Sequence, residues 1–135
     1  MEKNTLLIKR EGKPFIIKPG QFILGRTQEK IGIPKDLAGI LEGRSSVARI
    51  GIMVHAAGLL NPGAGMKAPM PIILEIFCQN SSPVKLYPGM GIAQLMFNKL
   101  SSPVTVGYDE RENSKFSGQE DPILFRENKG RELLF

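Results

Sequence analysis

The chain has 135 residues, 18 of them basic and 13 acidic, which gives a net charge of +5. This length suits one compact domain. No apolar run approaches the roughly 18 residues that a membrane span needs, and residues 1–10 lack the layout of a signal peptide. A single cysteine permits no internal disulfide. We therefore expect a cytoplasmic protein with no membrane-embedded part.

The charge is unevenly distributed along the chain. Residues 1–100 carry 13 Lys and Arg against 6 Asp and Glu, whereas residues 101–135 carry 5 against 7. A basic body followed by a slightly acidic tail favours an anionic ligand, such as one that bears phosphate.

Residues that could bind zinc are scarce: the chain has one histidine, His55, and one cysteine, Cys78. A structural zinc site needs about four such ligands and a catalytic site about three protein ligands. The zinc nucleobase deaminases need a His or Cys and two further Cys around the metal. The sequence excludes that chemistry, and we expect His55 to be structural and Cys78 to lie in the core.

Glycine and proline together make up 25 of the 135 residues, which disfavours long helices. Short apolar runs separated by turn residues instead predict strands. In chain order these are residues 5–8, 15–17, 21–24, 50–54, 72–77, 84–87 and 92–97. The pattern predicts a mostly-β fold, an antiparallel barrel or sandwich.

One segment predicts a short helix, with Ser45 as the N-cap of residues 46–50. This would place Ser45 and Arg49 on one helical face. From Tyr108 onward the chain is polar and poor in residues that favour strands. We expect a β domain over residues 1–107 and, over residues 108–135, a flexible tail that orders on ligand binding.

Residues 42–49 form the first candidate site, because they combine Arg44, Ser45, Ser46 and Arg49 with a glycine. The guanidinium group of arginine donates paired hydrogen bonds to phosphate or carboxylate oxygens. This cluster therefore predicts an anion-binding site. A capped surface turn with solvated arginines is the alternative interpretation.

Glu75 forms the second candidate site, because it stands inside the apolar run 72–77. A partly desolvated carboxyl group suits general acid and base work. The alternative is an outward-facing residue on a half-buried strand.

The tail offers a third candidate set, consisting of Tyr108 for stacking, Lys115 for phosphate and Gln119 for hydrogen bonds. A disordered polar tail is the alternative.

Taken together, these segments resemble the dCTP deaminase branch of the dUTPase superfamily. The ordered motifs are Leu41-Glu42-Gly43-Arg44-Ser45-Ser46 through Arg49, a glycine-bounded turn at 58–63, Leu74-Glu75, Leu86-Tyr87-Pro88-Gly89-Met90 and Ile92-Ala93-Gln94-Leu95-Met96-Phe97. The tail adds Ser101-Ser102-Pro103, Gly107-Tyr108, Lys115 and Gln119 at the spacing of the deaminase lid. The resemblance covers roughly residues 13–122.

The resemblance implies a distorted antiparallel β-barrel of the dUTPase-like type, a homotrimer with active sites between subunits, and zinc-independent deamination of dCTP to dUTP. By the family pattern Glu75 would shuttle protons, while Ser45 and Arg49 would hold the attacking water. Magnesium would arrive on the nucleotide triphosphate, with dUTP and dTTP as further nucleotide ligands. The remaining residues that the pattern assigns to nucleotide binding are Arg44, Ser46, Asn61, Gln94, Tyr108, Lys115 and Gln119.

Four departures from the family pattern keep other functions open. Asn61 replaces an acid that activates water in diphosphatase members, which speaks against dUTP hydrolysis and against a bifunctional enzyme. Ala64 replaces an aromatic residue near the sugar, and the loop 65–71 is longer than usual by about four residues. The altered loop, together with the lack of a counterpart to the family's Asp-containing N-terminal motif, favours a non-catalytic nucleotide-binding homologue.

A small basic barrel that binds nucleic acid has little support. The chain has no Trp, and its basic residues are not interleaved with stacking side chains. We expect neither nucleic acid nor a membrane as a partner.

Overall fold

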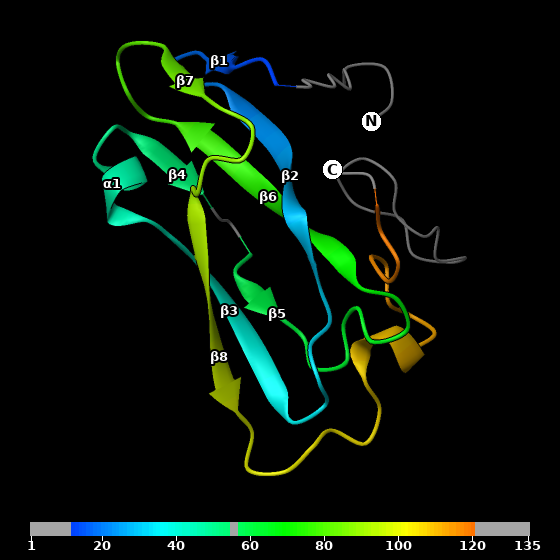
Figure 1. The fold of residues 1–135 in the computed structure, drawn as a ribbon. Helices are drawn as coiled ribbons and strands as arrows, with labels where there is room; N and C mark the ends of the chain where they lie inside the picture. The colour runs from blue at the N-terminus through cyan, green and yellow to red at the C-terminus, as the bar shows by residue number, and fades with distance from the viewer. Residues whose placement is uncertain (1–11, 55–56, 121–135) are drawn as a thin grey trace.

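The computed structural model describes residues 12–54 and 57–120 (Figure 1). The predicted strand at 5–8 and His55 lie outside the described residues. In chain order the elements are β1 (Phe15–Ile17), β2 (Phe22–Ile31), β3 (Leu37–Gly43), α1 (Ser45–Ala48), β4 (Ile52–Val54), β5 (Leu59–Leu60), β6 (Met70–Cys78), β7 (Val84–Leu86), β8 (Ala93–Lys99) and the 3-10 helix η2 (Tyr108–Glu110).

The strands form three antiparallel sheets with the orders β1-β7, β2-β6-β4 and β5-β3-β8. This confirms the predicted mostly-β antiparallel class. Within the described residues, however, the sheets are not closed into a barrel, because each ladder ends after two or three strands. Neither helix in the described part of the chain has the length and apolar character of a membrane span.

Two strands were not predicted from the sequence, β3 and β5, and β2 runs seven residues beyond its predicted end at residue 24. Gly39 in the middle of β3 looks like a strand breaker in the sequence. In the structure a Cβ at Gly39 would lie 3.1 Å from Ile33 Cδ1 and from Leu60 Cβ. The glycine therefore permits a close approach of β5 and residue 33 to β3.

The core lies between the sheets and draws on all three. Its buried members are Ile17, Leu41, Val47, Ile52, Val54, Leu74, Ile76, Cys78 and Leu86. Cys78 is fully buried, which confirms its prediction as a core residue. On β6 the buried residues alternate with half-buried ones over 74–78, so one face of the β2-β6-β4 sheet covers the core.

The helix prediction needs one correction: Arg44, not Ser45, is the N-cap of α1. Arg44 has extended backbone angles (φ −99°, ψ 136°), and its carbonyl accepts hydrogen bonds from the N–H groups of Val47 and Ala48. The helix therefore begins one residue earlier than predicted. The Arg49 N–H donates to the Ser45 carbonyl at 3.0 Å, so these residues are one turn apart, as predicted.

After β8 the chain passes the start of β3 and then runs up the side of the molecule opposite α1 (Figure 1). Hydrogen bonds from Leu100 N–H to the Asp36 carbonyl and from Val104 N–H to the Lys35 carbonyl guide this crossing. We call the residues that follow, 107–120, the C-terminal segment. It begins with Gly107 and η2 and lies beside the turn that follows β5.

Candidate functional site

The end of β3 and the start of β8 bring two of the predicted phosphate-binding side chains together. Arg44 directly follows β3, and its guanidinium donates a hydrogen bond to the Gly91 carbonyl at 3.1 Å. Gln94 lies on β8 opposite Glu42, and its side-chain amide donates to the Gly43 carbonyl at 3.2 Å. Both side chains are exposed yet held to backbone, which leaves further N–H donors for an anion.

The helix α1 presents Ser45, Ser46 and Arg49 beside Arg44. All four residues are exposed, while Val47 anchors the helix in the core. The N-cap residue Arg44 makes no side-chain capping hydrogen bond to the helix. The segment that the sequence singled out is therefore an exposed polar turn fixed by one buried side chain.

Glu75 lies on β6 opposite Leu24 of β2 and faces away from the core. It is half-buried, and its neighbours on that face include Phe77. Within the described residues no hydrogen bond or ion pair joins Glu75 to Ser45 or Arg49. The chain connects α1 to the sheet of Glu75 through β4, which follows Arg49. Ile52 of β4 pairs with Cys78 of β6, three residues from Glu75.

Asn61 opens a tight turn in which its carbonyl accepts a hydrogen bond from the Ala64 N–H. Two further backbone hydrogen bonds join Ile33 to Gly63 and Ala64, each at 2.8 Å. Gly63 has a φ of +83°, and a Cβ there would lie 2.5 Å from Gly107 Cα. Only glycine lets the turn and the C-terminal segment approach this closely.

The three predicted tail residues lie on one folded segment. The Tyr108 N–H donates to the Pro62 carbonyl at 2.8 Å, and the Tyr108 hydroxyl accepts a hydrogen bond from the Phe116 N–H at 3.3 Å. The Ser114 hydroxyl donates to the Tyr108 carbonyl. Lys115 and Gln119 are half-buried, and the Gln119 N–H donates to the Phe116 carbonyl.

A single chain does not bring all of the predicted site residues together. Arg44 and Gln94 lie at the Gly43 end of β3, whereas the Asn61 turn and Tyr108 lie beyond its Leu37 end. Six steps along a strand separate these ends by about 20 Å. Figure 1 shows the same separation, with α1 and η2 on opposite sides of the molecule.

The sequence did not single out the acidic residues that attach the tail to the body. Glu110 accepts hydrogen bonds from Lys35 Nζ at 2.7 Å and from the Gly107 N–H at 2.8 Å. The buried carboxylate of Asp109 accepts from the Lys67 N–H at 3.1 Å and from the Ser117 hydroxyl at 3.0 Å. The uneven charge of the chain was the signal that could have identified these contacts.

The hydrogen bond from Lys35 and that from Gly107 lower the pKa of Glu110, and a hydrogen bond from Lys30 lowers the pKa of Glu120. Both carboxylates are thereby favoured in their charged form. Between residues 12 and 120, gap excepted, no cluster of three His, Cys, Asp or Glu side chains could hold a metal ion.

Comparison with known proteins supplies the family. A dCTP deaminase-like family model matches residues 2–100. A protein of Dictyoglomus thermophilum called "dCTP deaminase, dUMP-forming" is 46% identical over 119 residues, which are 87% of this chain and 59% of that protein. This chain thus spans less than two thirds of the length of that relative.

Two solved structures share the fold. The 2'-deoxycytidine 5'-triphosphate deaminase of Agrobacterium tumefaciens superposes with a TM-score of 0.65 at 21% identity, over 72% of this chain and 29% of that one. The EIAV dUTPase superposes with a TM-score of 0.56 at 24% identity, over 69% and 73% of the two chains. The match over residues 2–100, on the fold described above, shows that this chain belongs to the dCTP deaminase-like family.

Proposed function

We propose that the protein is an enzyme that deaminates dCTP by hydrolysis and without zinc. The observation that carries this proposal is the exposed polar turn of Arg44, Ser45, Ser46 and Arg49, which lies with Gln94 at one end of the β5-β3-β8 sheet. These residues and Glu75 all lie inside the region that matches the dCTP deaminase-like family. The name of the Dictyoglomus relative supports the same substrate.

In the proposed reaction, water adds to C4 of the cytosine ring and ammonia leaves. The Glu75 carboxylate accepts a proton from the water and passes it to ring N3, and a further transfer gives the leaving amine its proton. Ser45 and Arg49 hold the water, and the Arg49 guanidinium stabilises the negative charge that develops on the attacking oxygen as C4 becomes tetrahedral. The balance is dCTP plus water to dUTP plus ammonia.

The triphosphate would be bound by Arg44, Ser46 and Gln94, with Mg²⁺ arriving on the phosphates as part of the substrate. The donors of Arg44 and Gln94 suit phosphate oxygens. Asn61 and the tail residues Tyr108, Lys115 and Gln119 would then contact the sugar, the base and the phosphates. The tail residues lie C-terminal to the family match, so their assignment rests on the motif spacing and on their shared folded segment.

A homotrimer would unite the two groups of residues that one chain keeps apart. The face of the β2-β6-β4 sheet that points away from the core carries the exposed side chains of Phe22, Leu24 and Met53 around Glu75 and Phe77. Large exposed apolar faces are typical of protein interfaces. Cover by a partner subunit would also supply the desolvation of Glu75 that the core does not.

The product of the proposed reaction is either dUTP or dUMP, and two observations favour different products. Asn61 has an amide where a diphosphatase needs an acid, which favours dUTP as the product. The name of the Dictyoglomus relative favours dUMP as the second candidate. An assay that follows pyrophosphate beside ammonia separates the two.

The test is to incubate the purified chain with dCTP, dUTP and CTP in the presence of Mg²⁺ and to measure ammonia, uracil nucleotides and pyrophosphate. Ammonia from dCTP without pyrophosphate is the expected result. Pyrophosphate as well would show that Asn61 does not prevent hydrolysis. Nucleotide binding without any product would place the chain with the non-catalytic homologues and overturn the proposal.

We expect Glu75→Gln to lower kcat for dCTP by about 10²- to 10⁴-fold, because the amide neither accepts nor donates the shuttled proton. Glu29→Gln is the matched control, since Glu29 is exposed on β2 and contacts Thr27 only through its backbone carbonyl. Equal rates for Glu75→Gln and the unchanged chain would exclude this mechanism.

A further inference from the structure

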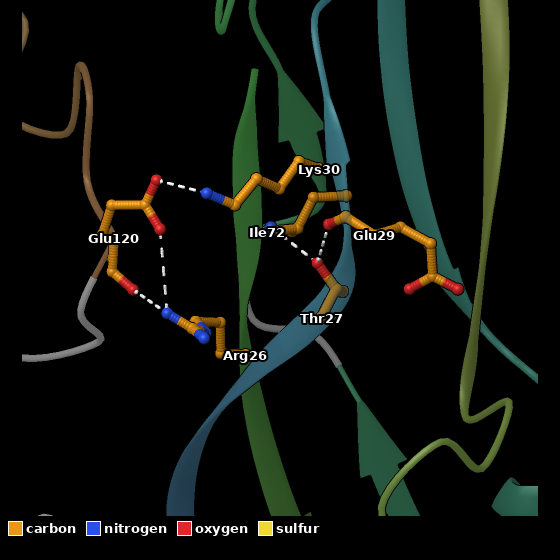
Figure 2. Close-up of polar contacts among 6 residues, drawn as sticks. All are labelled: Arg26, Thr27, Glu29, Lys30, Ile72 and Glu120. Carbon is orange, nitrogen blue, oxygen red and sulfur yellow. Dashed lines mark hydrogen bonds and ion pairs between the residues drawn. The ribbon is translucent and has the colours of Figure 1, made fainter. Parts of the chain in front are cut away.

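Glu120 at the end of the C-terminal segment is held by two basic side chains of β2 (Figure 2). Its carboxylate lies 2.7 Å from Lys30 Nζ and 3.8 Å from a guanidinium nitrogen of Arg26. The same guanidinium nitrogen donates a hydrogen bond to the Glu120 backbone carbonyl at 2.9 Å. Both the side chain and the backbone of this residue are therefore attached to the body of the protein.

An irregularity in β2 brings Arg26 and Lys30 to one carboxylate. Arg26 pairs with Ile73 and Lys30 with Pro71, so four steps along β2 match only two along β6. In a regular strand, side chains four residues apart would be separated by about 13 Å. The bulge shortens this separation, as is typical of bulges that redirect side chains.

Thr27 maintains the bulge, as Figure 2 shows. Its hydroxyl donates to the Glu29 carbonyl at 2.7 Å and accepts the Ile72 N–H at 2.9 Å. The side chain thus replaces a ladder hydrogen bond that the bulge interrupts. The geometry that presents Arg26 and Lys30 is thus held by contacts within the sheet.

The attachment at Glu120 lies at the far end of a segment that is also fixed at its start. At the start, Tyr108 bonds to Pro62, and Asp109 to Lys67. Lys115 and Gln119 lie between the two attachments. A segment fixed at both ends has less conformational entropy to lose when it contacts a ligand.

We infer that Glu120 is a positioning residue, which through Arg26 and Lys30 fixes the end of the C-terminal segment and so presents Lys115 and Gln119 to the nucleotide. This inference rests on the proposed nucleotide-binding role of that segment. In this proposal Glu120 acts through Lys115 and Gln119 and does not touch the nucleotide itself. The contact is electrostatic and exposed, so it weakens as ionic strength rises.

Hydrogen exchange of the full chain without nucleotide tests the attachment itself. We expect Glu120→Gln to raise the exchange rates of the 111–120 amides by about threefold in low salt, as for the loss of exposed ion pairs. The variant Arg26→Gln/Lys30→Gln should show the same increase. In the unchanged chain 1 M NaCl should raise these rates, and in Glu120→Gln it should have little further effect.

Glu112→Gln and Lys85→Gln are the matched controls, because both residues are exposed and neither belongs to this contact of Arg26, Lys30 and Glu120. Equal exchange in Glu120→Gln and Glu112→Gln would overturn the inference. This measurement needs no turnover, so it stays decisive if the proposed deamination fails.

Kinetics then test the positioning role. We expect Glu120→Gln to raise KM for dCTP by about threefold with little change in kcat, and Glu120→Asp to restore much of the loss. An unchanged KM beside raised exchange rates would show that the attachment exists but does not serve the nucleotide, and would also overturn the inference.

Discussion

At the scale of single residues, the contact between the turn after β5 and the C-terminal segment depends on glycines that let two stretches of backbone lie close together. Gly63 is the clearest case, because the turn after β5 and the start of the C-terminal segment meet at this residue. It combines a positive φ with a Cβ position that the Gly107 backbone already occupies. The turn that carries Asn61 and the segment that carries Tyr108 are thus linked through one glycine.

We expect Gly63→Ala to lower the free energy of unfolding by roughly 2–3 kcal/mol, from the positive φ and from displaced backbone. Gly20→Ala is the control, because Gly20 has a φ of +73° and nothing within 4 Å of its Cβ position. The difference between the two variants in urea unfolding isolates the steric contact. If Gly63→Ala costs no more than Gly20→Ala, the close approach is not needed for stability.

At the scale of elements, the 65–70 loop, which ends at the first residue of β6, and the C-terminal segment stabilise each other. Asp109 of η2 accepts a hydrogen bond from the Lys67 N–H, and Lys67 Nζ donates to the Asp109 carbonyl at 2.6 Å. Ser117 adds a hydrogen bond from farther along the segment. The loop between Ala64 and β6 therefore has a structural role, because it reaches this carboxylate.

Asp109→Ala should lower the free energy of unfolding by about 1–3 kcal/mol, because it removes the partner of two donors around a buried position. It should also raise hydrogen exchange in both the 65–70 loop and residues 110–118. Glu112→Ala, an exposed change on the same segment, is the control. Increased exchange in only one of the two segments would show that Asp109 does not couple them.

At the scale of the whole molecule, the uneven charge of the chain has a structural outcome. The basic body receives acidic residues of its own tail, with Lys35 paired to Glu110 and Lys30 paired to Glu120. Some basic residues of the body, from which we predicted an anionic ligand, therefore bind carboxylates of the same chain. The exposed residues around Arg44 take no part in these ion pairs and stay available for the proposed nucleotide.

The ion pairs of Glu110 and Glu120 predict that the C-terminal segment detaches from the body of the protein at low pH. The pKa of Glu110 and that of Glu120 lie below the ordinary value of 4.5. The attachment therefore contributes stability above about pH 4.5 and loses it as the pH falls through the folded-state values. An NMR titration of the side-chain carboxyl carbons should give midpoints below 4.5 in low salt and closer to 4.5 in 1 M NaCl. Ordinary midpoints in low salt would contradict the ion pairs.

The proposed homotrimer would be held together through the exposed apolar face of the β2-β6-β4 sheet. Phe22→Lys places a charge on the exposed apolar face around Glu75 and should convert the oligomer to a monomer in light scattering, with circular dichroism unchanged. Ile16→Lys is the control, because Ile16 is equally exposed on β1, in a different sheet. The same mass for Phe22→Lys and the unchanged chain would remove this face from the interface.

The division of the chain into residues 1–107 and a flexible tail stays a prediction. Residues 108–120 are folded against the body through η2 and through Asp109 and Glu120. Polar composition led to the expectation of flexibility, because apolar burial is the usual reason for a segment to order. Hydrogen bonds and ion pairs, which composition does not reveal, hold this segment instead.

Local patterns of turn residues and apolar runs were enough to predict the mostly-β class, a short helix within one residue of where α1 begins, and Cys78 as a core residue. Only the folded structure revealed β3 and its partner β5, because Gly39 in β3 is explained by the side chains of Ile33 and Leu60 that lie against it. It also decided that Arg26 and Lys30 meet Glu120, 94 and 90 residues away along the chain. Such contacts depend on a bulge and on a long-range crossing, and neither leaves a local pattern in the sequence.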